Sequence, residues 1–307
     1  MSRIVRVVSA NDDGRRLSDF LLRRMQLSKH FLARVKQVHD GILVNGIRRR
    51  VDWHISCGDT ISVDTSAGKM STLVSEQTAL SVVYEDDMVV VIDKPAGMAM
   101  YPHHPGQTGS LAAAILGHLQ EAGEQKNCHL LTRLDIGTSG LVLVAKNSYA
   151  AEYLQRTGVT KAYQCIVYGR LAQTCYLTLP ISRASSSLQR LGIVMSVAEE
   201  GKLSHTYIKP LLYDELYGFT YVRVITGSGR RHQIRVHLSH VGHPLLGDGT
   251  YGGPSLSEPW PLLHAAAIRY HHPENNHIFT HYSSFVRMIS EPVDWSVFSD
   301  TADLFER

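Results

Sequence analysis

The most informative stretch of the chain is Leu131-Thr132-Arg133-Leu134-Asp135-Ile136-Gly137-Thr138-Ser139-Gly140-Leu141. Gly, Thr and Ser at 137–140 are typical of a tight turn, and the apolar run at 141–145 predicts a buried strand. Asp135 therefore stands at the entrance to a core strand, two residues after an arginine. A carboxylate in this position is more often structural than reactive, because it can cap a turn or pair with the arginine.

The chain from Leu80 onward predicts a β-rich domain. A buried helix is expected at 111–119, and strands or strand-like segments are expected at 82–84, 88–92, 141–145, 163–168, 221–225 and 234–238. Strands outnumber helices and their spacing is irregular. We therefore expect an α+β fold with a mixed, largely antiparallel central sheet flanked by helices, over residues 80–307.

Residues 1–66 predict a separate small α/β module. Leu17, Phe20 and Leu21 share one face of a helix over 16–25, and Ser28 is a good N-cap for a second helix that ends near Gly41. A strand, an Asn-Gly turn and a return strand follow at 42–47, and another short strand at 60–63. Residues 67–79 are rich in small and polar residues without apolar periodicity, so they are the expected linker.

Positive charge is concentrated in this first module. Residues 1–66 hold 12 Lys and Arg against 7 Asp and Glu, whereas the remainder holds 19 against 21. Such an asymmetry of charge indicates that the module binds a polyanion. The residues expected to contact phosphates are Arg15, Arg16, Lys29 and Arg34. The alternative is that they form a solvated helix face.

Composition excludes several other classes of protein. The chain has 307 residues, 44% of them apolar and 19% charged, which describes an ordinary globular protein. No apolar stretch of about 18 residues could span a membrane, and residues 1–14 do not form a secretory signal. The four cysteines include no C-x-x-C pair and are expected to be reduced thiols. Reduced thiols are in keeping with a cytoplasmic protein, which is the expected location. We expect a monomer, because no oligomerisation seam is evident in the sequence.

Several segments, taken in order, resemble the RluA-type family of pseudouridine synthases over about residues 82–290. The segments are Asp93–Met98, Leu131–Leu141, Lys161–Gly169, Gly229–Gly252, and Leu263-His264-Ala265 with His272-Pro273. One short motif would be weak evidence, but several in the right order are strong. In front of them, residues 15–64 resemble the S4 RNA-binding module. The resemblance implies the pseudouridine synthase fold with an N-terminal S4-like α/β module.

The resemblance also implies an activity, the isomerisation of uridine to pseudouridine in RNA. Breaking the C1′–N1 bond and joining C1′ to C5 involves no redox change, so no cofactor or metal is expected. Asp135 would be the catalytic carboxylate, acting as a nucleophile at C1′ or by taking a proton from the sugar. These two routes stay open.

Other site residues follow from the same resemblance. Arg230 would keep Asp135 charged, and Tyr163 would face the uracil. Arg133 would fill the RNA stack as the base leaves it. Ile234 or Leu238 would lie near the uracil. Two departures from the family pattern, Thr132 in place of a histidine and Ile136 in place of a charged residue, could alter hydrogen bonding behind the loop.

The expected partner is structured RNA, with large-subunit ribosomal RNA favoured and transfer RNA as the alternative. Two rival functions remain, a non-catalytic RNA-binding or assembly protein and a glycosidase-like hydrolase that would need a second acid. Several histidines raise the question of a metal site, but none has a zinc-site spacing, so we expect turn and surface histidines. These are His103, His104, His271, His272, His277 and His281.

Overall fold

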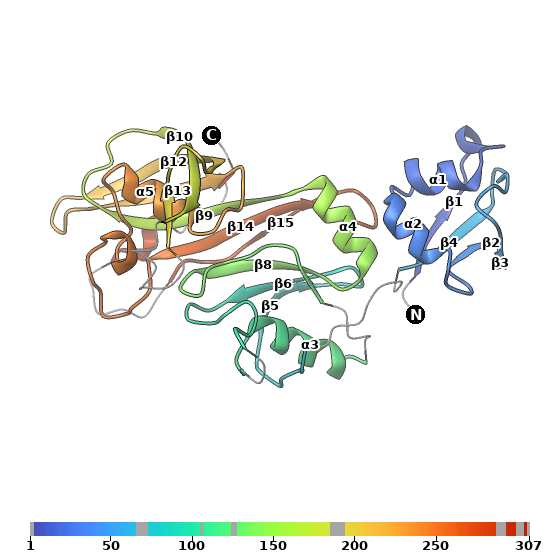
Figure 1. Cartoon of the computed structure of the whole chain (residues 1–307), viewed down its shortest axis with the longest axis horizontal. Helices are drawn as coiled ribbons and strands as arrows, with labels where there is room; N and C mark the ends of the chain where they lie inside the picture. The colour runs from blue at the N-terminus through green and yellow to red at the C-terminus, as the bar shows by residue number, and fades with distance from the viewer. Residues whose placement is uncertain are drawn as a thin grey trace.

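The computed structural model describes residues 3–65, 73–104, 107–123, 128–184, 194–286, 293–298 and 304–305. Two sheets organise the described residues (Figure 1). Residues 3–65 form a module at one end of the molecule, and the larger sheet extends away from it. This division agrees with the expected α+β architecture.

The N-terminal module has a four-stranded sheet in the order β1-β4-β2-β3, covered by two short helices. Its elements are β1 (Arg3–Val7), α1 (Leu17–Arg23), α2 (Lys29–Val35), β2 (Ile42–Val44), β3 (Ile47–Arg48) and β4 (Thr60–Asp64). Ser28 caps α2 as expected, since its Oγ accepts a hydrogen bond from the Phe31 N–H at 2.8 Å. Strand β1 was not predicted, and α2 ends six residues before Gly41.

The larger domain is built on an eleven-stranded sheet among the described residues, with the main order β11-β10-β12-β13-β9-β14-β8-β6-β5. All its pairings are antiparallel except that of β8 with β14. The elements as far as β9 are β5 (Ser81–Glu85), β6 (Val89–Lys94), α3 (Leu111–Glu121), β7 (His129–Leu130), β8 (Ser139–Ala145), α4 (Ser148–Thr157) and β9 (Val159–Tyr168). The later ones are β10 (Cys175–Arg183), β11 (Met195–Val197), β12 (Lys202–Asp214), β13 (Phe219–Thr226), α5 (Gln233–His240), β14 (Leu263–His271) and β15 (Ile278–Tyr282), with 3-10 turns at Gly249–Tyr251 and Trp295–Phe298.

Strands β6 and β8 are buried on both faces because helices cover the sheet from two sides. Alternate residues of a strand point to opposite faces. Val142 and Val144 therefore join a core with Leu111 and Ile115 of α3, whereas Leu143 joins the core that contains α4 and the module. Gly140 is required where β8 meets β14, because a Cβ there would lie 2.4 Å from the Ala265 carbonyl oxygen.

The N-terminal module packs directly against α4. Glu152 accepts hydrogen bonds from the Ser28 hydroxyl and, at 2.6 Å, from the Arg34 guanidinium. Phe31 meets the ring of Tyr149 edge-on, with ring centroids 5.9 Å apart. These contacts make the hydrophobic core of the module continuous with that of α4.

The structure corrects one predicted element. Residues 234–238 lie in helix α5 and not in a strand. Ile234 and Leu238 are four residues apart, a spacing that both a helix and a strand satisfy, so the short apolar pattern was ambiguous. Of the expected linker, residues 67–72 lie outside the described residues, and 73–79 contain no helix or strand.

No helix among the described residues has both the length and the apolar character that a membrane crossing requires.

Candidate active site

Asp135 lies in the loop between β7 and β8, and the chain on both sides holds that loop in place. The Asp135 carbonyl accepts a hydrogen bond from the Thr138 N–H at 3.0 Å, which closes the predicted turn. The next carbonyl, of Ile136, accepts bonds from the Gly97 N–H at 2.7 Å and from Lys94 Nζ at 3.3 Å. Lys94 is fully buried. The segment around Lys94 therefore positions the Asp135 loop.

Thr132 supports the same loop from behind. Its Oγ1 accepts a hydrogen bond from the Leu143 N–H at 3.1 Å, inside the core. A threonine at this position thus ties the loop directly to strand β8.

Two side chains of the α5 region, a guanidinium and an imidazole, approach the Asp135 carboxylate. Arg235 Nη1 lies 3.7 Å from Oδ2, and His232 Nε2 lies 3.9 Å from Oδ1. Among the described residues, no hydrogen bond ends on this carboxylate. Its side chain is 23% exposed, so the carboxylate is partly sheltered yet open on one side.

Arg235 is held by a second carboxylate. Its Nε and Nη2 donate to the two oxygens of buried Asp248, both at 2.7 Å, and its guanidinium lies over the ring of Tyr251 at 4.9 Å. Burial acts to lower the pKa of Arg235, but the hydrogen bond and charge of Asp248, followed by the charge of Asp135, raise it above its usual value. The bidentate geometry fixes a permanent positive charge beside Asp135.

This geometry corrects the expected partner of Asp135. Arg230 lines the same pocket, but among the described residues it forms no ion pair with Asp135. Arg230 lies in the loop before α5, where its N–H donates to Gln233 Oε1 at 3.1 Å. Arg235 sits on the buried side of the helix, which carries its guanidinium to the carboxylate.

The hydrogen-bond partner of His232 bears on which of its two ring nitrogens carries the proton. Its Nδ1 lies 2.8 Å from the Tyr251 hydroxyl, which also accepts a hydrogen bond from the Met195 N–H at 3.0 Å. Burial lowers the pKa of His232 and raises that of Tyr251, so both groups are neutral near pH 7. If Tyr251 donates its proton to Nδ1, the imidazole N–H is at Nε2, the atom that faces Asp135.

The backbone of His232 also matters to this arrangement. Its φ of 54° is in the left-handed region, and it is the N-cap residue of α5. Non-glycine residues in this conformation are uncommon and concentrate at functional sites.

Tyr163 and Lys161 form the wall of the pocket contributed by β9. The Lys161 Nζ lies 5.2 Å from the centre of the Tyr163 ring and donates to the Arg133 carbonyl at 3.1 Å. Burial lowers the pKa of Lys161 to about 8, although the charge of Asp135 opposes this shift. Burial and then the charge of Asp135 raise the pKa of Tyr163, so Tyr163 is a neutral phenol at pH 7.

Five of the six site residues predicted in the larger domain meet in one place. A small hollow of about 50 Å³ is lined by Asp135, Tyr163, Arg133, Arg230 and Ile234, among others. It adjoins a larger hollow of about 700 Å³, which shares Asp135, Arg133, His232 and Arg235 with it and extends to Tyr101 and Trp260. Leu238 is an exception, since it is fully buried in the core and lines neither hollow.

The predicted phosphate contacts of the module divide into two kinds. Arg15, Arg16 and Lys29 are exposed, and Arg15 makes an ion pair with Asp12 at 3.0 Å. Arg34 is bound to Glu152 of α4 and so attaches the module to the larger domain. Its predicted contact with phosphate would have to compete with that ion pair.

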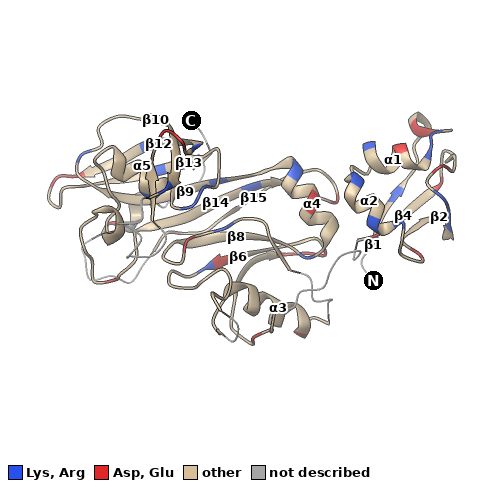
Figure 2. Ribbon diagram, in the orientation of Figure 1, with Lys and Arg blue, Asp and Glu red and all other residues tan. Residues whose placement is uncertain are grey.

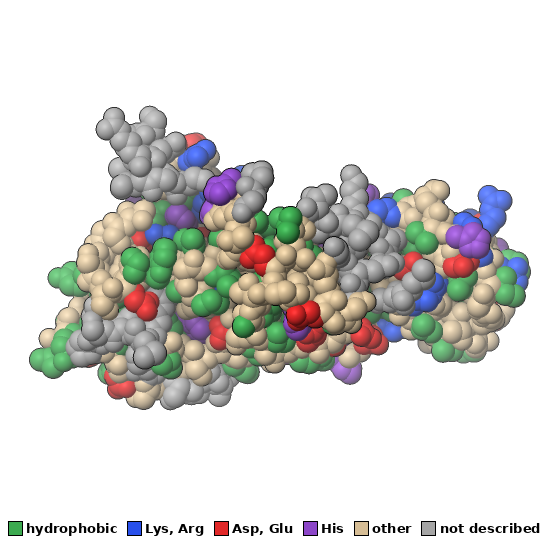
Figure 3. Space-filling model, turned by 90° about the horizontal axis from the view of Figure 1, so that it is seen from below, with side chains coloured by type: hydrophobic (Ala, Val, Ile, Leu, Met, Phe, Trp, Pro, Cys, Tyr) green, Lys and Arg blue, Asp and Glu red, His purple; other side chains and the backbone are tan. Residues whose placement is uncertain are grey.

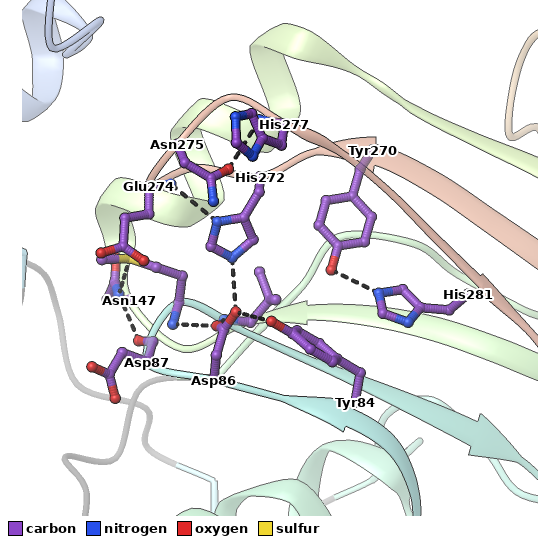
Figure 4. Close-up of polar contacts among 12 residues, drawn as sticks. Tyr84, Asp86, Asp87, Asn147, Tyr270, His272, Glu274, Asn275, His277 and His281 are labelled. Carbon is purple, nitrogen blue, oxygen red and sulfur yellow. Dashed lines mark hydrogen bonds and ion pairs between the residues drawn. The ribbon is translucent and has the colours of Figure 1, made fainter.

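A second cluster with similar side chains lies near the turns β5–β6 and β14–β15 (Figure 4). Asp86 accepts hydrogen bonds from His272 Nε2 at 2.8 Å, from the Tyr84 hydroxyl at 2.7 Å, and from the N–H groups of Met88 and Val89. His272 is 2% exposed, so the expectation of a surface histidine is wrong at this position. No group of three potential metal ligands occurs among the described residues.

Sequence reasoning missed several residues of the site. Arg235, His232 and Asp248 all fall inside the quoted Gly229–Gly252 segment, but no role was assigned to them. Helical periodicity over 233–240 would have placed Arg235 on the buried face. The contact of Tyr251 with His232 joins residues 19 positions apart, and no local pattern predicts it.

Comparisons with known proteins show the family of the chain. The family model described as RNA pseudouridylate synthase matches residues 88–240. A Bacillus subtilis protein named uncharacterized RNA pseudouridine synthase YjbO is 34% identical over 255 residues, covering 80% of this chain and 87% of its own. Ribosomal large subunit pseudouridine synthase D of Pseudomonas aeruginosa is 32% identical over 255 residues, covering 77% and 78%.

A solved structure shows the same fold. Human RNA pseudouridylate synthase domain containing 1 superimposes with a TM-score of 0.56 at 26% identity, covering 69% of this chain and 86% of its own. The residues matched by the family model begin after the N-terminal module, so the resemblance of that module to S4 stays a prediction. The resemblance of the motifs to RluA-type enzymes is confirmed, and the chain belongs to the RNA pseudouridylate synthase family.

Proposed function

We propose that Asp135 is the catalytic residue with which this pseudouridine synthase isomerises uridine in structured RNA. The observation that carries this proposal is the open carboxylate of Asp135. It lines the pocket, stands beside the fixed charge of Arg235, and has no hydrogen bond from any described residue. A carboxylate that stands beside a fixed positive charge and accepts no hydrogen bond has lone pairs available to a substrate.

The proposed reaction moves the uracil within one nucleotide. The C1′–N1 bond breaks, C1′ joins C5, the C5 proton leaves, and N1 gains a proton. Asp135 either attacks C1′ or takes a proton from the sugar and later returns it. In both routes Arg235 places a fixed positive charge 3.7 Å from the carboxylate and orients its oxygens.

Tyr163 and His232 act around the base in this proposal. The neutral Tyr163 phenol beside the pocket packs against the uracil face and can relay the C5 proton. The Nε2–H of His232 can donate to Asp135 or to a uracil carbonyl as charge changes in the site. Ile234 completes the apolar part of the pocket, and Leu238 supports it from the core.

Arg133 suits the role of holding the RNA open. Its side chain is exposed at the pocket, while its carbonyl is fixed by Lys161. A base must leave its stack before Asp135 can reach C1′, at a cost of a few kcal/mol. An inserted guanidinium would stabilise the vacated stack.

Large-subunit ribosomal RNA is the proposed substrate. Support comes from the names of relatives such as ribosomal large subunit pseudouridine synthase D, and from the basic N-terminal module. In this proposal the module is S4-like and binds the phosphates of the RNA through Arg15, Arg16 and Lys29. Transfer RNA remains the alternative substrate.

The glycosidase-like alternative receives no support from the site. It needs a second carboxyl group as a proton donor. Asp248 is the acid that shares Arg235 with Asp135, but it is buried and both its oxygens accept from Arg235. With both oxygens taken up by the guanidinium, Asp248 is not placed to give a proton to a leaving group.

The test is pseudouridine mapping of total RNA from cells that carry the gene, lack it, or carry Asp135→Asn. We expect one or more uridines to lose modification both in the deletion and with D135N, whereas purified D135N still binds RNA. An unchanged map in the deletion strain would contradict the function. Loss of RNA binding by D135N would instead indicate a structural role for Asp135.

A further inference from the structure

A groove leads from the Asp135 pocket toward the N-terminal module. It has a volume of about 710 Å³ and shares Arg133, Lys161 and Ser228 with the pocket. At its other end it is lined by Gln155 and Thr157 of α4 and by residues of the β14–β15 hairpin. The groove is therefore continuous with the active site.

The side chains of the groove are cationic or neutral. Arg133, Lys161, Arg269 and His271 line it, and no Asp or Glu is found among its described lining residues. Arg269 is exposed, its guanidinium lies 4.2 Å from the centre of the Phe305 ring, and Nε donates to Thr280 Oγ1 at 3.3 Å. Neither Arg133 nor Arg269 makes an ion pair with any described carboxylate. These charges are available to an anionic ligand.

The groove ends beside the contact between the two parts of the chain. Arg156, next to the groove residues Gln155 and Thr157, donates to the backbone carbonyl of Gln26 at 2.5 Å and to its side-chain oxygen at 3.0 Å. Beyond it, a hollow of about 650 Å³ is lined by Arg6 and Arg24 of the module, with Glu274 as its acidic residue among those described. Cationic side chains thus continue from Arg133 to the module.

The pictures agree with this path. Figure 2 shows a basic segment on β14, and both a basic and an acidic segment on α4, between the active-site end and the module. Figure 3, seen from the side of α3, instead shows acidic side chains in the middle of that face and basic ones mainly at the module's end. The α3 face is therefore the less favourable surface for a polyanion.

We propose that this groove binds the RNA strand on one side of the target uridine and leads it to the N-terminal module. The inference rests on the proposed function, since it assumes that RNA brings the uridine to Asp135. Phosphates would meet Arg269 and Arg133, and the hydroxyls of Thr157 and Ser228 would be within the same groove. The contacts of Glu152 with Ser28 and Arg34 would keep the module in line with the groove.

Charge-altering variants of the full-length protein test the groove. The probe is a fluorescein-labelled single-stranded oligoribonucleotide of mixed sequence, about 20 nucleotides long, which exceeds a single-strand site of up to about 16 nucleotides. Fluorescence anisotropy is measured across salt concentrations. We expect Arg269→Glu to weaken binding about tenfold and to reduce the salt slope by about one. Gln155→Lys should tighten binding about threefold, and Gln155→Glu should weaken it by a similar factor.

A matched control is Arg170→Glu. Arg170 is also exposed and also lies over an aromatic ring, that of Tyr213 at 5.1 Å, but it lines none of the hollows described above. It changes the net charge as much as R269E does, so binding should change less than twofold. Equal effects of R269E and R170E on RNA binding, or no difference between Q155K and Q155E, would contradict the proposal that RNA binds in the groove.

Cross-linking with an RNA that contains 4-thiouridine gives an independent readout. We expect cross-linked peptides from 155–160 and 269–271, in wild-type protein and in D135N. Cross-links confined to the Asp135 pocket and the module would count against the groove. If wild-type protein converts uridine while R269E and Q155E keep the same kcat/KM, RNA binding in the groove is contradicted and the proposed function stands. If no RNA is converted but the charge series holds, the proposed function fails and RNA binding by the groove stands.

Discussion

The molecule contains two clusters of Asp, His and Tyr side chains, and they differ in how far their hydrogen bonds are satisfied. At Asp86, four donors surround the carboxylate at 2.7 to 2.9 Å, and His272 is buried (Figure 4). At Asp135, the nearest groups are the Arg235 guanidinium at 3.7 Å and the neutral His232 imidazole at 3.9 Å, and the carboxylate faces a pocket. The same residue types therefore occur in two arrangements, one saturated with hydrogen bonds and one open.

The difference shows what makes a carboxylate available for chemistry. A saturated carboxylate is low in free energy and would have to break hydrogen bonds before it reacted. The bonds from His272 and Tyr84, which outweigh the effect of burial, hold the pKa of Asp86 below its usual value. Asp135 is kept in position by its backbone and by Arg235, which leaves its oxygens unoccupied. Composition alone cannot separate the two clusters.

Among the changes that leave Asp135 in place, the largest effect is expected from Arg235→Lys, which keeps the charge but loses the bidentate contact with Asp248. Lysine cannot hold Asp248 and stand beside Asp135 in the same geometry. We expect kcat for pseudouridine formation to fall about 100-fold, which corresponds to about 2.7 kcal/mol of transition-state stabilisation. Single-turnover kinetics measure this. Lys146 follows β8 and forms an ion pair with Glu85 at 2.9 Å, outside the Asp135 pocket. Lys146→Arg should leave kcat unchanged, and equal losses in both variants would contradict a special role for Arg235.

Asp86→Asn should affect stability and not catalysis. The substitution replaces a charged acceptor of four hydrogen bonds with an amide that can accept only some of them. We expect the free energy of unfolding to fall by about 2 kcal/mol. Denaturant unfolding measures this loss, and kcat at a temperature where the variant is folded should stay within twofold of wild type. A large loss of kcat would mean that the Asp86 cluster takes part in the reaction.

Tyr251→Phe tests the tautomer of His232. Without the hydroxyl, His232 Nδ1 loses the donor that directs its proton to Nε2, so we expect kcat to fall about tenfold with a smaller change in KM. Nitrogen chemical shifts of His232 should report a mixture of tautomers in the variant and a single one in wild type. Tyr84→Phe is the matched change at the other cluster and should leave kcat unchanged.

The smallest expected effect is the pH dependence that Asp86 adds to stability. Its pKa is lower in the folded protein than in the unfolded chain, where it is about 3.9. Its contribution is therefore fully present above pH of about 5 and is lost as pH falls through 3.9 and lower. The difference in the free energy of unfolding between wild type and D86N should shrink over that range. A difference that grows on acidification would contradict this assignment.

Much of the fold was predictable from local patterns. The turn before Leu141, the cap at Ser28 and the buried helix after Ser110 all follow from residues close together in sequence, and the structure confirms them. Strands β10, β12, β14 and β15 were not predicted. Their pairing depends on contacts across the sheet, and several of them mix apolar and polar residues without clear alternation.

The site was predictable only in part, for a related reason. Asp135, Tyr163, Arg133, Arg230 and Ile234 do meet in one pocket, as the order of the motifs implied. The choice of Arg235 over Arg230 depended on whether 233–240 formed a helix, and a short apolar pattern left that undecided. The sequestering of Arg34 by Glu152 joins positions 118 residues apart. Only the three-dimensional arrangement reveals it.

The most direct test of the central claim is release of the C5 hydrogen from RNA labelled with tritium at C5 of uracil. Isomerisation must release this hydrogen, whichever route Asp135 takes. Under single-turnover conditions we expect wild type and D86N to release tritium at similar rates, and D135N to release it at least about 1000-fold more slowly while binding the same RNA. Release by D135N at the wild-type rate would show that the reaction does not depend on Asp135.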